Sequence, residues 1–114
     1  MVLQRVCMAL ILTVSLAAAA LAAVDKGAES ISLDGGSRGR VPFPHHRHQG
    51  ALKDCRVCHD LFPQEKDSIH KLKGEGHLVS KQVMNKLCIT CHKAEEKAGK
   101  PSGPKTCAQC HVRE

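Results

Sequence analysis

Hydrophobic positions divide the chain into two unequal parts. Residues 6–23 form an almost unbroken apolar run, whereas the remainder is rich in Lys and Gly with short apolar patches between them. Outside the run, the clearest helical periodicity covers residues 78–87, where apolar residues at 79, 83, 84 and 87 fall on roughly one face. The pattern therefore predicts a short helix over 78–87.

The apolar run has the features of a targeting segment. Arg5 precedes it, and Ala20-Leu21-Ala22 has the small-x-small pattern of a cleavage site, which predicts a secretory signal peptide over residues 1–23, cleaved near Ala22/Ala23. The alternative is an uncleaved anchor, because about 18 apolar residues can just span a bilayer; the Ala-rich run and its cleavage motif favour removal. Cys7 then leaves with the signal, and the mature chain is expected in the periplasm.

Composition restricts what the rest of the chain can be. There is no Trp or Tyr, and only two Phe, so a chain this short lacks the large side chains from which a core is usually built. Disulfides, a metal or a cofactor must supply the missing interior. This excludes a large-substrate enzyme that relies on side-chain chemistry alone. Without the signal the net charge is about +5.

The six remaining cysteines all fall in one motif, C-x-x-C-H, which occurs three times and is typical of c-type haem attachment. Two thiols at this spacing form thioethers with the two vinyl groups of one porphyrin, and the His that follows becomes the proximal iron ligand. We therefore predict three covalent haem c groups that serve as the core. Their residues are Cys55, Cys58 and His59; Cys88, Cys91 and His92; and Cys107, Cys110 and His111.

Two other interpretations of the cysteines explain less of the sequence. The four cysteines of the second and third motifs, Cys88 to Cys110, have a zinc-ribbon spacing. Zinc would leave Cys55 and Cys58 without partners and gives no reason for a His after every pair. A framework of three disulfides leaves the same histidines unexplained.

Five further histidines can close the open faces of the three irons: His45, His46, His48, His70 and His77. An iron with an open face binds oxygen, peroxide or nitrite, whereas an iron with two ligands mainly transfers electrons. His45 and His48 are spaced i and i+3, so on a helical turn they lie about 5–6 Å apart and can each serve a different iron. His46 points elsewhere and is predicted to be no ligand.

The third distal ligand comes from His77 or His70. His77 directly precedes the helix predicted over 78–87, which favours it, whereas His70 lies beside a loop predicted at 71–74. Met84 could also bind iron, but packing against a porphyrin is the preferred interpretation.

The chain resembles the class III multihaem cytochromes c, specifically the small three-haem c7 type that is related to cytochrome c3. The resemblance covers about residues 30–114 and rests on Phe43-Pro44-His45 followed by His48, on the three motifs, and on Gly103-Pro104-Lys105-Thr106 ahead of the last one. It implies a small, mostly irregular and helical domain with a cofactor core and a short N-terminal β ribbon. The ribbon would pair 31–33 with 41–43 around 34–36.

The resemblance also implies a set of ligand pairs and a domain layout. His45 would pair with His59, His48 with His92, and His77 or His70 with His111. The lead-in is expected over 24–41, including the ribbon, and the three-haem domain over 42–114. The segment from 60 to 87 is longer than is usual in the three-haem branch, which bears on the third ligand.

These features together predict a periplasmic electron carrier with low-potential bis-histidine haems that serves anaerobic respiration and has no catalytic residues. The alternatives are a small reductase of metals or sulfur compounds with one open or exposed haem, and a haem sensor or a subunit of a membrane redox complex. Neither nucleic acid nor stable membrane insertion is expected, and the chain should be a monomer. Lysines around the second and third motifs are candidates for docking acidic redox partners: Lys81, Lys86, Lys93, Lys97, Lys100 and Lys105.

Overall fold

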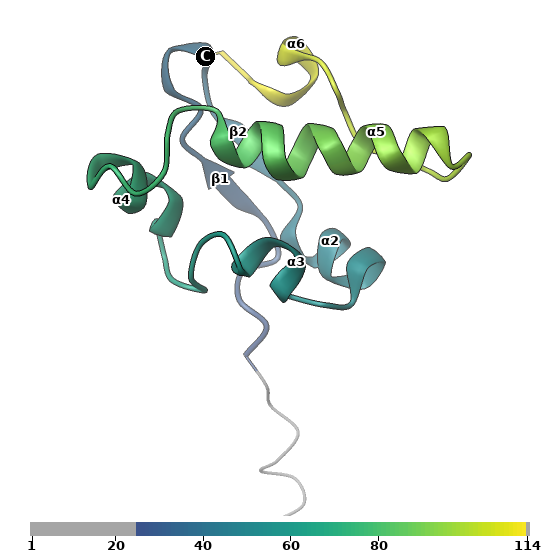
Figure 1. Ribbon diagram of the computed structural model, residues 1–114, viewed down its shortest axis with the longest axis horizontal. Coiled ribbons are helices and arrows are strands. Elements are labelled where there is room, and N and C mark those ends of the chain that lie inside the picture. The colour runs from purple at the N-terminus through teal and green to yellow at the C-terminus, as the bar shows by residue number, and fades with distance from the viewer. Residues whose placement is uncertain (1–24, 114) are drawn as a thin grey trace, which may run out of the picture.

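The computed structural model describes residues 25–113, so the predicted signal peptide over residues 1–23 lies outside the described residues. The elements follow in the order β1 (Ile31–Leu33), the 3₁₀ turn η1 (Gly36–Arg38), β2 (Val41–Phe43), α2 (His45–Leu52), α3 (Arg56–His59), α4 (Ser68–Gly74), the π-helix η2 (Met84–Cys88), α5 (Ile89–Lys97) and α6 (Cys107–Cys110). Figure 1 shows α5 crossing the molecule, with α6 above it and α2 and α3 below. Within 25–113 no helix has the length and apolar character that crossing a membrane requires.

The two strands form the ribbon that the family resemblance predicts. β1 and β2 pair antiparallel, with Ile31 opposite Phe43 and Leu33 opposite Val41. The connection is tightened by the Asp34 carboxylate, which accepts a hydrogen bond from the Gly36 N–H at 2.9 Å. The predicted fold class, a small and mostly helical or irregular domain with one short ribbon, is confirmed.

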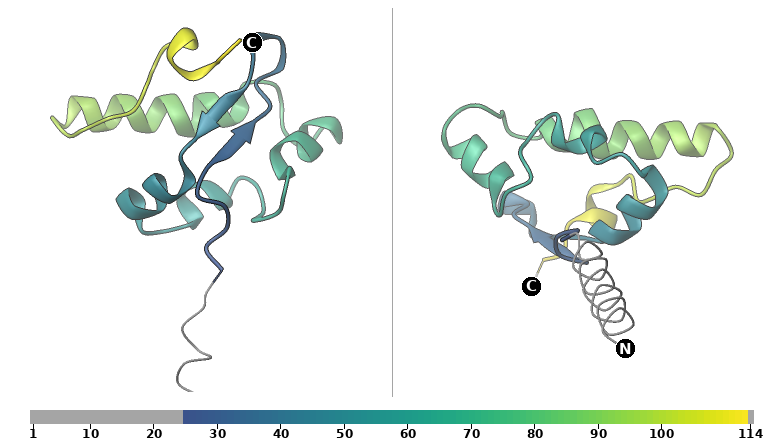
Figure 2. Two further views of the ribbon diagram at one scale, coloured as in Figure 1. Left: turned by 180° about the vertical axis from the view of Figure 1, so that it is seen from behind. Right: turned by 90° about the horizontal axis from the view of Figure 1, so that it is seen from below.

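The C-terminal end of the chain is held against this ribbon. Val112 N–H donates to the Arg40 carbonyl at 2.8 Å, forming an isolated antiparallel bridge. His111 Nδ1 donates to the Gly39 carbonyl at 3.0 Å. The third motif, although remote in sequence, is therefore fixed to the β1–β2 connection, as both views in Figure 2 show.

Helix α4 replaces the loop expected at 71–74. Its C-terminus is a Schellman motif, in which Gly76 N–H donates to the Lys73 carbonyl (3.2 Å) and His77 N–H to the Leu72 carbonyl (2.8 Å). Gly76 has φ +78°, which only glycine adopts without strain. The prediction of a loop beside His70 was therefore wrong, because a strong C-terminal cap stabilises this short helix.

The helix predicted over 78–87 begins later than expected. Helical structure starts at Gln82, whose side-chain oxygen accepts a hydrogen bond from the Val79 N–H at 2.9 Å. Lys81 has φ +67° and is not helical. Val79 is 68% exposed rather than on the buried face. His77 consequently belongs to the end of α4 and not to the start of the next helix.

The described residues contain almost no side-chain core. Leu78, at 5% exposure, is the one buried apolar residue of this part of the chain, and Ser68 is the one buried polar residue. No side chain in residues 25–113 is both large and fully buried. The view from below in Figure 2 shows the elements arranged in a ring rather than in packed layers. This organisation is what a domain cored by a cofactor requires.

Candidate haem-binding site

Each C-x-x-C-H motif lies on about one turn of helix. The first and third motifs form α3 and α6, and the second spans the junction of η2 and α5. In the first motif His59 N–H donates to the Cys55 carbonyl at 3.0 Å, and in the third His111 N–H donates to the Cys107 carbonyl at 2.8 Å. Residues at i, i+3 and i+4 of a helical turn share a face, so both thiols and the histidine of a motif can meet the same porphyrin.

The six motif cysteines are all free thiols, which contradicts the disulfide alternative. Burial raises the pKa of the Cys58 thiol, and its proximity to Cys91 raises it further. Burial likewise raises the pKa of Cys88, with Cys58 as the next contribution. Thiols of the first and second motifs therefore lie close to one another. None of the six motif cysteines pairs with another.

Two motif histidines each lie beside a histidine of α2, at a nearly equal spacing between ring centroids. The ring centroids of His45 and His59 are 6.4 Å apart, and those of His48 and His92 are 6.2 Å apart. A metal–imidazole nitrogen bond of about 2.0 Å plus a ring radius of about 1.15 Å puts each ring centroid about 3.15 Å from the metal. Two imidazoles on opposite sides of one metal therefore have centroids about 6.3 Å apart. These two pairs therefore fit a six-coordinate haem iron.

Backbone carbonyls orient all four of these rings. His45 Nδ1 donates to Ala28 O (2.9 Å) and His48 Nδ1 to Pro44 O (3.0 Å). The proximal rings are held in the same way. His59 Nδ1 donates to Phe62 O (3.1 Å), and His92 Nδ1 donates to Pro104 O (2.5 Å). A carbonyl oxygen can only accept, so Nδ1 carries the proton and Nε2 keeps the lone pair that a metal binds.

The remaining candidates differ in which ring nitrogen is used. His46 engages Nε2, which lies 3.0 Å from the Gly27 carbonyl oxygen, as suits a histidine predicted to be no ligand. His70 engages Nδ1, 2.9 Å from Asp34 Oδ2, which leaves its Nε2 free. The Gly36 N–H and His70 together hold the pKa of the Asp34 carboxyl below its usual value. The His77 ring is exposed, and the described part of the chain gives it no hydrogen-bond partner.

The proximal His111 is oriented by Gly39 but differs from the other two in its surroundings. Within residues 25–113 it has no facing histidine ring at the spacing of the other pairs. It lies against Gly35, where an added Cβ would come within 2.5 Å of His111 Nδ1. Gly35 adjoins Asp34, the partner of His70.

Sequence reasoning proposed the ligands but gave no indication of the groups that orient them. The orienting carbonyls belong to Ala28, Gly39, Pro44, Phe62 and Pro104, and a backbone carbonyl leaves no signature in side-chain identity. Pro44 and Pro104 could have been noticed, because both stand in segments that carry the family resemblance. Nothing in the sequence marked Ala28.

The zinc alternative requires the thiols of the second and third motifs to converge. Among residues 25–113 the structure contains no group of three or more His, Cys, Asp or Glu side chains that could hold a bare metal ion. The four thiols of the second and third motifs therefore do not converge on one point, as a zinc ribbon requires.

Comparison with known proteins gives a consistent family. Residues 41–112 match the model of "Cytochrome c7 and related cytochrome c". The chain is 33% identical over 75 residues to a cytochrome c7 of Geobacter metallireducens, covering 66% of this chain and 67% of the relative. A high-molecular-weight cytochrome c of Nitratidesulfovibrio vulgaris is 34% identical over an alignment of 83 positions, and the match covers 63% of this chain but only 14% of that protein.

Solved structures agree with the sequence relatives. The triheme cytochrome PpcA of Geobacter sulfurreducens superposes with a TM-score of 0.51 and 30% identity, over 75% of this chain and all of that one. Cytochromes c7 are electron carriers and not enzymes, and no catalytic residue is required of this chain. The three attachment motifs, the histidine pairs and these matches together show that the chain belongs to the cytochrome c7 family of multihaem electron-transfer proteins.

Proposed function

We propose that this protein is a periplasmic electron carrier with three covalent haem c groups, each closed by two histidines, which shuttles electrons between redox partners in anaerobic respiration. Haem, when bound, supplies an iron that takes up and returns one electron. The chain contributes the attachment, the axial ligands and the surface that partners approach. Axial histidines on both faces favour low reduction potentials, because imidazole stabilises the oxidised iron more than a thioether does.

The observation that carries the proposal is the pair of ring spacings, 6.4 Å for His45 and His59 and 6.2 Å for His48 and His92. Both values match the separation of two imidazoles on one metal. A metal held on both faces has no free position for oxygen, nitrite or another small substrate. Electron transfer is then the chemistry left to it.

The third distal ligand comes from His70 or His77. The family resemblance left both open and sequence position favoured His77, but the contacts favour His70. The His70 Nδ1 donates a hydrogen bond to Asp34, so its Nε2 carries no proton and keeps the lone pair that a metal binds. Asp34 is also next in sequence to Gly35, which lies against the ring of His111. A carboxylate in this role is a common partner of metal-binding histidines.

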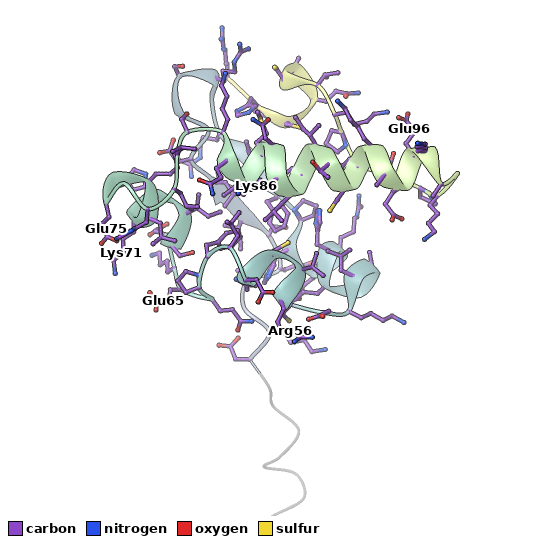
Figure 3. The ribbon with its side chains drawn as sticks, in the orientation of Figure 1. Arg56, Glu65, Lys71, Glu75, Lys86 and Glu96 are labelled. Atoms are coloured by element: carbon purple, nitrogen blue, oxygen red, sulfur yellow. The ribbon has the colours of Figure 1, made fainter. Side chains whose placement is uncertain are left out.

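Five of the six lysines proposed for docking fall into two groups. Lys100 lies 3.9 Å from Glu95, and Lys105 is ion-paired with Glu96, so their charges are partly neutralised. Three other lysines are exposed: Lys86 in η2, and Lys93 and Lys97 in α5. They are seven and four residues apart, which places them on one stripe of the continuous helix that η2 and α5 form. Figure 3 shows Lys86 near the start of this helix and Glu96 near its end. We propose that this lysine stripe meets acidic partners and speeds their association.

Substitution of the axial histidines tests the ligand set. His48→Ala should leave one iron with a single protein ligand, so that about one third of the irons become high-spin in the absorption and EPR spectra. Arg47→Ala is the matched control, since it shortens a neighbouring side chain of α2 that binds no iron and should leave every iron low-spin. The same measurement on His70→Ala and His77→Ala identifies the third distal ligand. Low-spin spectra in all of these variants would refute the proposed ligand set.

A further inference from the structure

Four successive carbonyls of the lead-in are bound by the first part of α2. The carbonyl of Lys26 accepts from the Gln49 side chain (2.7 Å), and that of Gly27 lies 3.0 Å from His46 Nε2. The Ala28 carbonyl accepts from His45 Nδ1 (2.9 Å), and the Glu29 carbonyl accepts from the His46 backbone N–H (3.0 Å). We call residues 25–29 the strap.

The strap has its own means of holding this shape. Asp25 Oδ1 accepts a hydrogen bond from the Gly27 N–H at 2.9 Å, which closes a tight turn. Gly27 has φ +75°, in the left-handed region that glycine adopts without strain. The view from below in Figure 2 shows the segment entering the domain beside α2.

Gly27 also lies against the ring of His45. A Cβ added at this position would sit 3.3 Å from His45 Cε1 and 3.6 Å from Nδ1. The ring is thus bounded on one side by Gly27, bonded at Nδ1 to Ala28, and faced at 6.4 Å by the ring of His59. Each of these contacts limits rotation of the imidazole.

We propose that the strap is a positioning element for the distal ligand His45: it fixes the tautomer and orientation of the ring, and keeps the iron shared with His59 closed. This inference rests on the proposed function, because it assumes that His45 binds iron. A carbonyl bonded to the far nitrogen makes an imidazole a stronger ligand, and loss of such a partner typically weakens metal binding about 10- to 100-fold. The residues immediately after the predicted signal peptide would then be part of a haem site.

The proposal explains two features that the ligand set leaves unassigned. His46, the surplus histidine of α2, uses its ring to hold the strap rather than to bind iron. Its backbone N–H, one of the groups left without a partner at a helix start, is satisfied by the Glu29 carbonyl. Both interactions hold the strap where the Ala28 carbonyl meets His45.

The test compares two glycine variants of the holoprotein. Gly27→Ala adds a side chain at φ +75° against His45, whereas Gly99→Ala adds one at φ +71° with open space around it. Both incur the same backbone strain, and only the first disturbs the strap. In the reduced protein, carbon monoxide should bind to one of the three haems at least about 10-fold faster in Gly27→Ala than in wild type. Gly99→Ala should match wild type.

A spectroscopic signature and a double variant separate positioning from general loosening. The ferric EPR signal of one low-spin haem should shift in Gly27→Ala, and its midpoint potential should rise because the ligand is a weaker donor. Added to His45→Ala, in which that iron is already open, Gly27→Ala should have no further effect on carbon monoxide binding. An additive effect would place its action at another haem and overturn the proposal.

If the Gly27→Ala holoprotein cannot be produced, a second pair of variants tests the same proposal. Gln49→Ala removes the bond to Lys26 without altering backbone conformation or a ligand, and Arg47→Ala on the same helix is its control. Faster carbon monoxide binding in the first variant alone supports the strap; equal rates in both overturn it. Rapid binding by the wild-type protein would instead show that the proposed ligand set fails, which is a different result.

Discussion

The chain should not fold without its haems. The perturbation is to replace the cysteines of all three motifs by serine, which abolishes covalent attachment and leaves the rest of the sequence intact. Within residues 25–113, Leu78 is the one apolar side chain that the protein itself buries. The interior must therefore come from the porphyrins.

The free energy that the side chains contribute to folding can be judged from Leu78. Full burial of a leucine contributes about 2 kcal/mol, whereas fixing the backbone of one residue costs about 1–2 kcal/mol. Leu78 thus offsets the ordering of only one or two residues. In the described part of the chain the longest α-helix, α5, has 9 residues, and helices shorter than about 12–15 residues are marginal in water. A lone two-stranded ribbon is equally weak.

Circular dichroism and amide NMR measure the outcome. The serine variant should have a disordered far-UV spectrum, poorly dispersed amide signals and no thermal transition, whereas the holoprotein in the same buffer should melt cooperatively. A sigmoidal melt with dispersed amide signals in the serine variant would refute the reasoning. It would mean that the side chains alone can specify the fold.

Three further predictions concern the holoprotein. Leu78→Ala should lower the free energy of unfolding by about 2–3 kcal/mol in chemical denaturation, while Val79→Ala, at a position 68% exposed, should change it by less than about 0.5 kcal/mol; equal effects would contradict the assigned burial. Because folding lowers the pKa of the Asp34 carboxyl, its stabilising contribution is present above about pH 4 and is lost as the pH falls through the folded-state pKa. Asp34→Asn should therefore lower the melting temperature at about pH 6 but not at about pH 2, and a pH-independent difference would argue against this role. Replacing Lys93 and Lys97 by Gln should slow electron transfer to an acidic partner protein at low salt and have little effect at high salt; an unchanged rate at low salt would remove the lysine stripe from docking.

The sequence was sufficient for the features that depend on short spacings. Each of the three C-x-x-C-H motifs lies on about one helical turn, so the attachment residues could be proposed without a structure. The same holds for His45 and His48, whose i, i+3 spacing on α2 directs them to two different proximal rings. The ribbon followed from the family resemblance.

Features that depend on tertiary contacts could not be predicted in this way. Helix α4 is too short to be stable by propensity, and the capping by Gly76 and the bond from His70 to Asp34 hold it in place. The strap is equally hidden, because it uses backbone carbonyls and so carries no recognisable side-chain pattern. Its glycine was visible in the sequence, but the reason for it lies in the ring of His45.

The measurement that tests the central claim most directly is carbon monoxide binding to the reduced, wild-type holoprotein. If two histidines close each of three irons, the reduced absorption spectrum should be low-spin throughout and should not change when carbon monoxide is added at neutral pH. Binding at one haem in three would show that a distal position is vacant. The protein would then have to be considered as a reductase or a sensor rather than as a carrier.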